Sequence, residues 1–297
     1  MTAAHGEAAG SAAVGLSLAS AVIWGTSDFV GGIAARRLPS PAVVTLSHSL
    51  SLAMLVSLAL IYGSKWPDPQ SAIYGALAGL ACGTGVMVLY KALALGGMGL
   101  TAAVSGVLAA VLPVIWAFAT EGLPRIPQIA GIVLAAVAIW MIARAPGSPS
   151  SKQATLLGAA AGASFGCLFI LLKLAGRGGV LWPLACSRMA STTLAAGVTW
   201  IGMRRTDGAR RNSKQTPSWP GWAVLGLIGI AGVFDASGNA FYTIATRLGR
   251  LDIAAVLSSL YPASTIVLAA LLLKERTTLS QAAGMALALV AVVLISA

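Results

Sequence analysis

The chain has 297 residues, of which 58% are hydrophobic and only 9% are charged, and its formal net charge is +11. Soluble domains carry about 25% charged residues and present a mostly wettable surface, so this composition excludes a soluble globular protein. The positive charge does not indicate nucleic-acid binding, because basic side chains in short loops orient membrane helices and contact anionic lipid headgroups.

Apolar runs separated by Gly, Pro and charged residues predict ten transmembrane helices. A membrane span needs roughly 20 predominantly apolar residues, so ten spans use about 200 residues and leave about 100 for loops. The loops are short except for a basic loop at 203–218. We therefore predict an all-α, multi-pass integral protein of the cell membrane. The predicted spans are 12–34, 42–62, 71–94, 100–120, 127–144, 154–174, 181–202, 219–245, 252–273 and 279–296.

The N-terminal segment and the cysteines indicate neither a cleaved signal peptide nor a metal site. No Lys or Arg precedes the first apolar run, so we expect the first helix to remain in the mature protein. Cys82, Cys167 and Cys186 lie inside apolar runs, which predicts packing residues rather than disulfides or metal ligands. We expect no cofactor.

The two halves of the chain repeat each other. With an offset of 140 residues, Ser47 falls on Ser187. With an offset of 153, QIAGIVLAAVAIWMIA from Gln128 matches QAAGMALALVAVVLIS from Gln281 at eight of sixteen positions. Each half holds five helices, and because five is odd the second half enters the membrane from the opposite side. Inverted repeats of this kind place a substrate site near the midplane, between the halves, and permit alternating access.

Three segments carry a further pattern: WGTSDFVGG from Trp24, VLPVIWAFATEGLPRIPQIAGIVLAAVAIW in the first half, and YPASTIVLAALLLKERTTLSQAAGMALALVAVVLIS from Tyr261. Together they resemble the EamA-like branch of the drug/metabolite transporter superfamily. The resemblance implies two five-helix repeats, at 14–143 and 156–296, in a secondary transporter that often exports amino acids or other small metabolites. Asp28 departs from the family pattern, which often has Asn there.

The loop charges and the family resemblance imply opposite orientations. If both termini are cytoplasmic, the cytoplasmic loops hold six basic residues and the opposite loops hold twelve. The positive-inside rule therefore favours external termini, whereas the resemblance implies cytoplasmic ones. We leave both orientations open.

Four ionisable side chains lie well inside the predicted spans, where each costs about 2.5–3.5 kcal/mol on insertion scales and normally faces the bundle interior or water. Trp24 and Asp28 are four residues apart and share one helix face. Together they suit a wall of a substrate cavity in which the Trp24 ring stacks on a solute or holds a cation. Asp28 could instead carry a proton. The structural alternative pairs Asp28 with Arg36 or a headgroup. The four residues are Asp28, His48, Arg188 and Asp235.

The eighth predicted span carries a polar stripe formed by Asp235, Asn239 and Tyr242, which predicts the lining of a cavity. Asp235 could also form a structural ion pair with Arg188, because an arginine keeps its charge and needs a carboxylate or water nearby. A substrate carboxylate is a further candidate partner for Arg188. His48 occupies the position equivalent to Arg188, and could take part in proton coupling or form a neutral hydrogen bond between helices.

Three tyrosines and two prolines are further candidates for the solute pathway. Tyr90, Tyr242 and Tyr261 suit a pocket for a mid-sized organic solute, with core packing as the alternative for each. Pro113 and Pro262 lie inside predicted spans, where a missing backbone hydrogen bond permits a kink.

Repeated acidic residues and a glycine ridge indicate packing rather than chemistry. Glu121 and Glu275 end equivalent helices in the two halves and are expected to anchor them. Gly158, Gly162 and Gly166 form a small-residue ridge that permits close helix contact within the bundle or in a homodimer.

No catalytic signature is present: the sequence has no metalloprotease motif, no phosphate-binding glycine loop and no soluble domain for ATP hydrolysis. We therefore expect a secondary transporter, and no enzyme, that moves a small metabolite, with efflux as the expected direction. The alternatives are an intramembrane enzyme using Asp28, His48 and Asp235, and a non-transporting assembly or sensor subunit. The expected partners are the solute and the lipid bilayer, with a homodimer left open.

Overall fold

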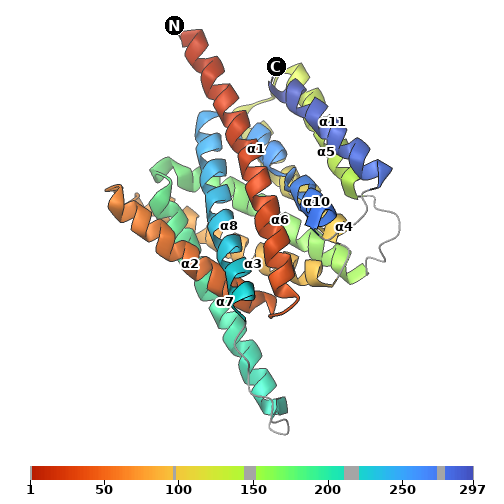
Figure 1. The fold of residues 1–297 in the computed structure, drawn as a ribbon. Helices are drawn as coiled ribbons and strands as arrows, with labels where there is room; N and C mark the ends of the chain where they lie inside the picture. The colour runs from red at the N-terminus through yellow and green to blue at the C-terminus, as the bar shows by residue number, and fades with distance from the viewer. Residues whose placement is uncertain (1, 96–97, 144–151, 211–220, 273–277, 297) are drawn as a thin grey trace.

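The computed structural model describes residues 2–95, 98–143, 152–210, 221–272 and 278–296, which form helices joined by short turns (Figure 1). Two consecutive short helices, α9 and α10, make up one broken span. The helices are α1 Thr2–Ala35, α2 Ser40–Ile61, α3 Pro69–Ala94, α4 Met98–Glu121, α5 Ile126–Ala143, α6 Lys152–Ala175, η1 Gly176–Gly178, α7 Leu181–Arg210, α8 Trp222–Leu248, α9 Leu251–Ser258, α10 Tyr261–Leu272 and α11 Leu279–Ser296.

The described helices confirm the predicted ten-span membrane fold. Seven spans, those of α1 to α4, α6, α8 and the α9–α10 pair, are long and apolar enough to cross a membrane, and α5 and α11 are shorter apolar helices. α7 is 30 residues long but less apolar. Its mean hydropathy is lowered by the charged residues of its last two turns, at 204–210, and by side chains buried inside the bundle, among them Ser187, Arg188 and Ser191. A polar helix is tolerated there because its polar groups face protein rather than lipid.

The ninth span is broken where the sequence analysis predicted a kink. α9 ends at Ser258 and α10 begins at Tyr261. Pro262 has no backbone N–H, so it cannot donate the helical hydrogen bond to the carbonyl group of Ser258. Pro113, by contrast, lies inside a helix that continues past it. The break positions Tyr261 at the start of a new helix in the middle of the bundle.

The helix contacts follow an approximate two-fold symmetry between the halves. α1 packs along α8, and the equivalent helices α6 and α3 pack along each other in the same way. α2 packs against its equivalent α7, and α5 against its equivalent α11. Figure 1 shows both termini at one end of the bundle and the end of α7 at the other. These reciprocal contacts agree with two duplicated, oppositely oriented halves.

Two glycines bring the central helices into close contact at equivalent crossings. A Cβ on Gly79 of α3 would collide with the backbone carbonyl oxygen of Ser187 on α7. A Cβ on Gly232 of α8 would collide with the carbonyl oxygen of Ser47 on α2. The offsets of 153 and 140 that relate the repeats also relate these two crossings. The same close contact is therefore built once in each half.

The predicted glycine ridge is used inside the bundle. Gly162 of α6 faces the carbonyl oxygen of Ser105 on α4, with a Cβ position 2.5 Å from it, and Gly158 faces Thr101 in the same way at 2.9 Å. Gly166 continues the ridge against Leu112. The ridge therefore serves the contact of α6 with α4.

Glu121 anchors the end of α4, as predicted. Its carboxylate forms an ion pair with Lys173 of α6 and accepts a hydrogen bond from the backbone N–H of Leu251 at 3.1 Å. It thereby ties together α4, α6 and the start of α9. The equivalent residue Glu275 lies outside the described residues.

The close crossings predict a specific effect of added side chains. Gly79→Val and Gly232→Val should each lower the thermal unfolding temperature of the purified protein, because overpacking costs about 1–3 kcal/mol. Gly197→Val is the matched control, since a Cβ on that α7 glycine meets nothing within 4 Å. Equal unfolding temperatures for the three variants would contradict this account of the crossings.

Candidate functional site

A cavity lies between the two halves of the protein, with an empty volume of about 310 Å³ that includes the space at its mouth. The space open to a water-sized molecule inside it is about 20 Å³, enough for about one water, so the cavity is narrow in this conformation. Four of the eight lining side chains are aromatic and two are carboxylates. They come from α1, α3, α6, α8 and α10, and are Trp24, Asp28, Val86, Phe165, Leu168, Phe169, Asp235 and Tyr261.

The aromatic side chains form a packed wall. The ring of Trp24 stacks on Phe169, with centroids 5.3 Å apart and an interplanar angle of 9°. Phe169 in turn stacks on Tyr242 at 4.6 Å, which supports the wall from behind. Phe165 meets Tyr261 edge to face at 6.4 Å. Because α1, α6, α8 and α10 all contribute, the wall joins both halves.

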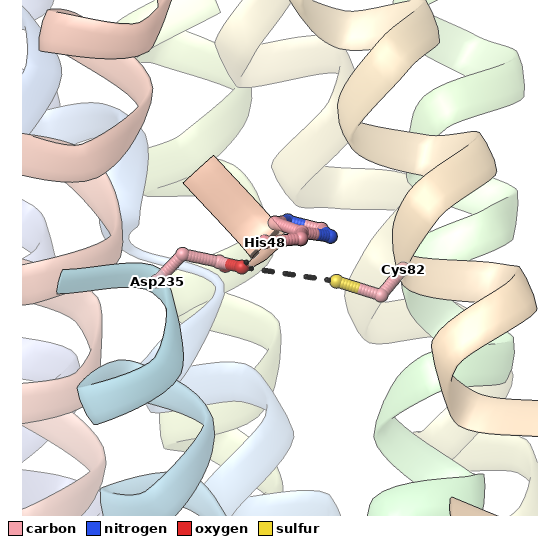
Figure 2. A group of neighbouring side chains, drawn as sticks. All are labelled: His48, Cys82 and Asp235. Atoms are coloured by element: carbon pink, nitrogen blue, oxygen red, sulfur yellow. Dashed lines mark hydrogen bonds and ion pairs between the residues drawn. The ribbon is translucent and has the colours of Figure 1, made fainter. Parts of the chain in front are cut away.

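Beside the cavity, a buried cluster forms around the guanidinium of Arg188. Its Nη1 atom donates to Asp235 Oδ2 at 2.5 Å and to His48 Nε2 at 3.1 Å, and it lies 3.6 Å from Cys82 Sγ. Arg188 is fully buried. In Figure 2 the Asp235 carboxylate on α8 faces the Cys82 thiol on α3, with His48 next to both. The predicted ion pair of Arg188 with Asp235 is confirmed.

The cluster consists of two pairs of equivalent residues. The offset of 140 relates His48 to Arg188, and the offset of 153 relates Cys82 to Asp235. Each pair has a charged member in the second half and a neutral member in the first. Cys82 by itself predicts only a packing residue, but the 153-residue offset that aligns it with Asp235 marks it as a member of the cluster.

The hydrogen bonds around His48 are consistent with a neutral imidazole. Ser191 Oγ donates to the carbonyl oxygen of Arg188 at 3.1 Å, so it accepts from His48 Nδ1 at 2.8 Å. Nε2 is then the atom that accepts from Arg188. This arrangement supports the interpretation of His48 as a hydrogen-bonded link between α2 and α7.

Three members of the cluster could in principle hold a metal ion. His48 Nε2 or Nδ1, Cys82 Sγ and an Asp235 carboxylate oxygen lie within 4.8 Å of one another, and this donor set suits a cation such as Zn²⁺. Arg188 Nη1 lies within contact of the same three side chains, however, and already supplies a positive charge. A metal ion would fit only if this guanidinium moved away.

The residues predicted for the solute pathway fall into two groups. Trp24, Asp28, Asp235 and Tyr261 line the cavity. The remaining four do not line it and are buried between helices; they are Tyr90, Arg188, Asn239 and Tyr242. Contact of these four with a solute stays a prediction.

Two of the buried tyrosines bridge helices at equivalent places. The hydroxyl of Tyr90 donates to the carbonyl oxygen of Ser27 at 3.4 Å, and that of Tyr242 donates to the carbonyl oxygen of Phe169 at 3.3 Å. The first bond joins α3 to α1 and the second joins α8 to α6. These hydroxyls support the helices that carry the cavity wall.

Phe165 and Phe169 line the cavity but are not among the residues predicted from the sequence. An offset of 141, one residue beyond that of the second helix, places Trp24 on Phe165 and Asp28 on Phe169. The cavity-facing positions of α1 are therefore repeated in α6, where both are aromatic. That repetition was the signal that could have identified them.

Asp28 differs from Asp235 in having no fixed partner. Within the part of the chain that the structure describes, its carboxylate takes part in no ion pair and accepts no hydrogen bond. The side chain is nonetheless buried, with 8% of the residue exposed. Structural pairing therefore does not account for Asp28 in this structure.

Comparison with known proteins decides the family. The profile of the EamA-like transporter family matches residues 11–144 and 152–297. The chain belongs to the EamA-like transporter family. Membership implies membrane transport of small solutes rather than an enzymatic activity, and the two matched segments agree with duplicated halves. The repeat bounds of 14–143 and 156–296 stay predictions.

A solved structure shares the fold of this EamA-like protein. It is described only as the crystal structure of a protein, and it aligns over 96% of each chain with a TM-score of 0.71 at 19% sequence identity. At this identity the likeness shows the fold alone. No curated protein matches the chain.

The Arg188 cluster predicts strong energetic coupling. Arg188→Met and Asp235→Asn should each destabilise the protein by about 3–5 kcal/mol, because each removes one charge of a buried pair and leaves the other uncompensated. The double variant should lose clearly less free energy of unfolding than the two single variants lose in sum. Thermal unfolding of the purified variants measures all three.

Cys82→Ala is the control for this cycle, since it removes only the thiol contact of the same cluster and should cost less than either charge substitution. Additive losses in the double variant would show that Arg188 and Asp235 do not act as a pair.

Proposed function

We propose that this protein is a secondary transporter that moves a small organic solute through the cavity between its halves by alternating access. The observation that carries the proposal is the composition of the cavity wall, to which α1 and α3 of the first half and α6, α8 and α10 of the second all contribute. A site shared by two oppositely oriented repeats opens to one side or the other when one repeat rocks against its partner.

Contacts between the halves at one end of the bundle give this motion a gate. Trp66 follows α2 and Trp182 is the second residue of α7, and their ring centroids lie 4.9 Å apart. The indole N–H of Trp182 also donates to the carbonyl oxygen of Ser64 at 2.8 Å. In the rocking motion that we propose, these contacts separate when the cavity opens toward the end that carries the termini.

We further propose efflux of a small metabolite related to the amino acids that the family resemblance implies. Asp28 is our candidate for the coupled proton, since its carboxylate has no partner in the described residues. Asp235 and His48 are less suited to that role because both are bound to Arg188.

Alternating access predicts that a reagent can reach the cavity from both sides of the membrane. A cross-link between Trp66 and Trp182 should block the access from one side. Val86→Cys, in a background with Cys82, Cys167 and Cys186 replaced by Ala, should react with a membrane-impermeant thiol reagent in right-side-out and in inside-out vesicles. Joining Trp66→Cys to Trp182→Cys with a short bifunctional thiol reagent beforehand should abolish labelling from the end of the termini only.

Leu80→Cys is the matched control on the same helix. Leu80 is 43% exposed on the apolar surface of α3, so its thiol should face lipid and escape the reagent from both sides. A protein in which Val86→Cys is labelled from neither side, with or without the cross-link, would be a static assembly subunit and not a transporter.

A further inference from the structure

We propose that the solute is a small organic cation, an amine or a quaternary ammonium compound, whose charge lies against Asp28 and the aromatic wall. This inference rests on the transport function proposed above and narrows its solute class. Three features of the cavity carry it: an unpaired carboxylate, the aromatic rings that line the same space, and the lack of a basic side chain among the described lining residues.

The first feature is the unequal state of the two carboxylates in the cavity. Asp235 is neutralised by Arg188 at 2.5 Å. Asp28 has no ion pair and no hydrogen bond in the described residues, although it is buried. An isolated carboxylate in a low-dielectric site is neutralised either by a proton or by a positive charge beside it, so a cationic ligand can take the place of the proton on Asp28.

The second feature is the type of surface beside this carboxylate. Trp24 lies one helical turn before Asp28 on the same face of α1, and Phe169 and Tyr261 line the same cavity. An aromatic ring presents a negative face that attracts a cation within about 6 Å. A wall of rings around one carboxylate therefore favours a cation with apolar substituents over a metal ion or a sugar.

The third feature distinguishes an amine from an amino acid. The eight residues that line the cavity include no Lys, Arg or His. Arg188 is the basic residue of the neighbouring cluster, but it is fully buried and its Nη1 is bound to Asp235. Its Nε and Nη2 atoms have no hydrogen-bond partner among the described residues, yet they too are buried and Arg188 does not line the cavity. A zwitterion would thus leave its carboxylate without a partner.

Binding of ligands to the purified protein tests this inference, if the ligands have similar shapes and differ in charge. Choline is a cation, 3,3-dimethylbutan-1-ol is its neutral isostere, and glycine betaine is the related zwitterion. 2-Phenylethylamine, phenylalanine and 3-phenylpropionate form a second series of cation, zwitterion and anion. The cation of at least one series should raise the unfolding temperature and bind at least tenfold more tightly than its partners, since ligands that bind the folded state stabilise it.

Two variants assign the effect to the cavity. Asp28→Asn should weaken binding of the cation at least tenfold and leave the other members of its series unchanged. Asp68→Asn is the matched control, because it removes a carboxylate outside the spans. Asp68 caps α3 by accepting the Ser71 backbone N–H at 2.9 Å, which lowers the pKa of that carboxyl and keeps it charged at the assay pH. Asparagine caps a helix about equally well.

The outcomes separate this inference from the transport proposal. If a zwitterion, an anion or a neutral isostere binds more tightly than the cation of its series, the proposal of a cationic solute is wrong. It is also wrong if neither cation binds. In either case, labelling of Val86→Cys from both sides would still support transport. Binding of the cation that survives Asp28→Asn also overturns the inference, since it would place the charge elsewhere.

Discussion

A fully buried arginine at the centre of a membrane bundle constrains everything around it. Arg188 cannot lose its charge, so a carboxylate must reach it, and Asp235 does so at 2.5 Å. The pair also contacts side chains of α2 and α3, so four helices must meet closely at one point. Gly79 and Gly232 permit this because they have no side chain at the points where α3 crosses α7 and α8 crosses α2. The remaining helices then enclose the cavity against this fixed centre.

Duplication explains why the chemistry of the centre is unequal in the two halves. A residue near the two-fold axis of a repeat meets its own equivalent. Two arginines or two aspartates there would repel each other in a low-dielectric environment, so the halves had to differ at these positions. The neutral residue His48 contacts its charged equivalent Arg188, and the neutral Cys82 contacts its charged equivalent Asp235. The centre therefore holds one ion pair and two neutral side chains. The backbone is nearly symmetric while the charge is confined to one half.

The sequence predicted the spans, the repeat and the Arg188–Asp235 pair, because each depends on a simple physical rule. Span length follows from bilayer thickness, and a charge inside a span requires a partner. The cavity wall could be predicted only in part, because Trp24 and Tyr261 stand out as candidates whereas the phenylalanines of α6 do not. Interior-facing positions of α6 and α8 are apolar or aromatic whether they pack or line a space, so Phe169 and Tyr242 look alike in sequence. Only the structure separates Phe169 in the wall from Tyr242 behind it.

The contrast between the two carboxylates follows from what a solute-driven conformational change demands. A ligand shifts an equilibrium between states only by the difference in its affinity for them, so some binding energy must remain available in the empty protein. A cavity in which Asp28 and Asp235 were both paired would offer a charged solute little, while two unpaired carboxylates would destabilise the fold severely. Asp235 is bound to the cluster that holds the helices together, and Asp28 stands apart on α1. Asp235 thus stabilises the helix bundle, and Asp28 remains unpaired and can bind the positive charge of a solute.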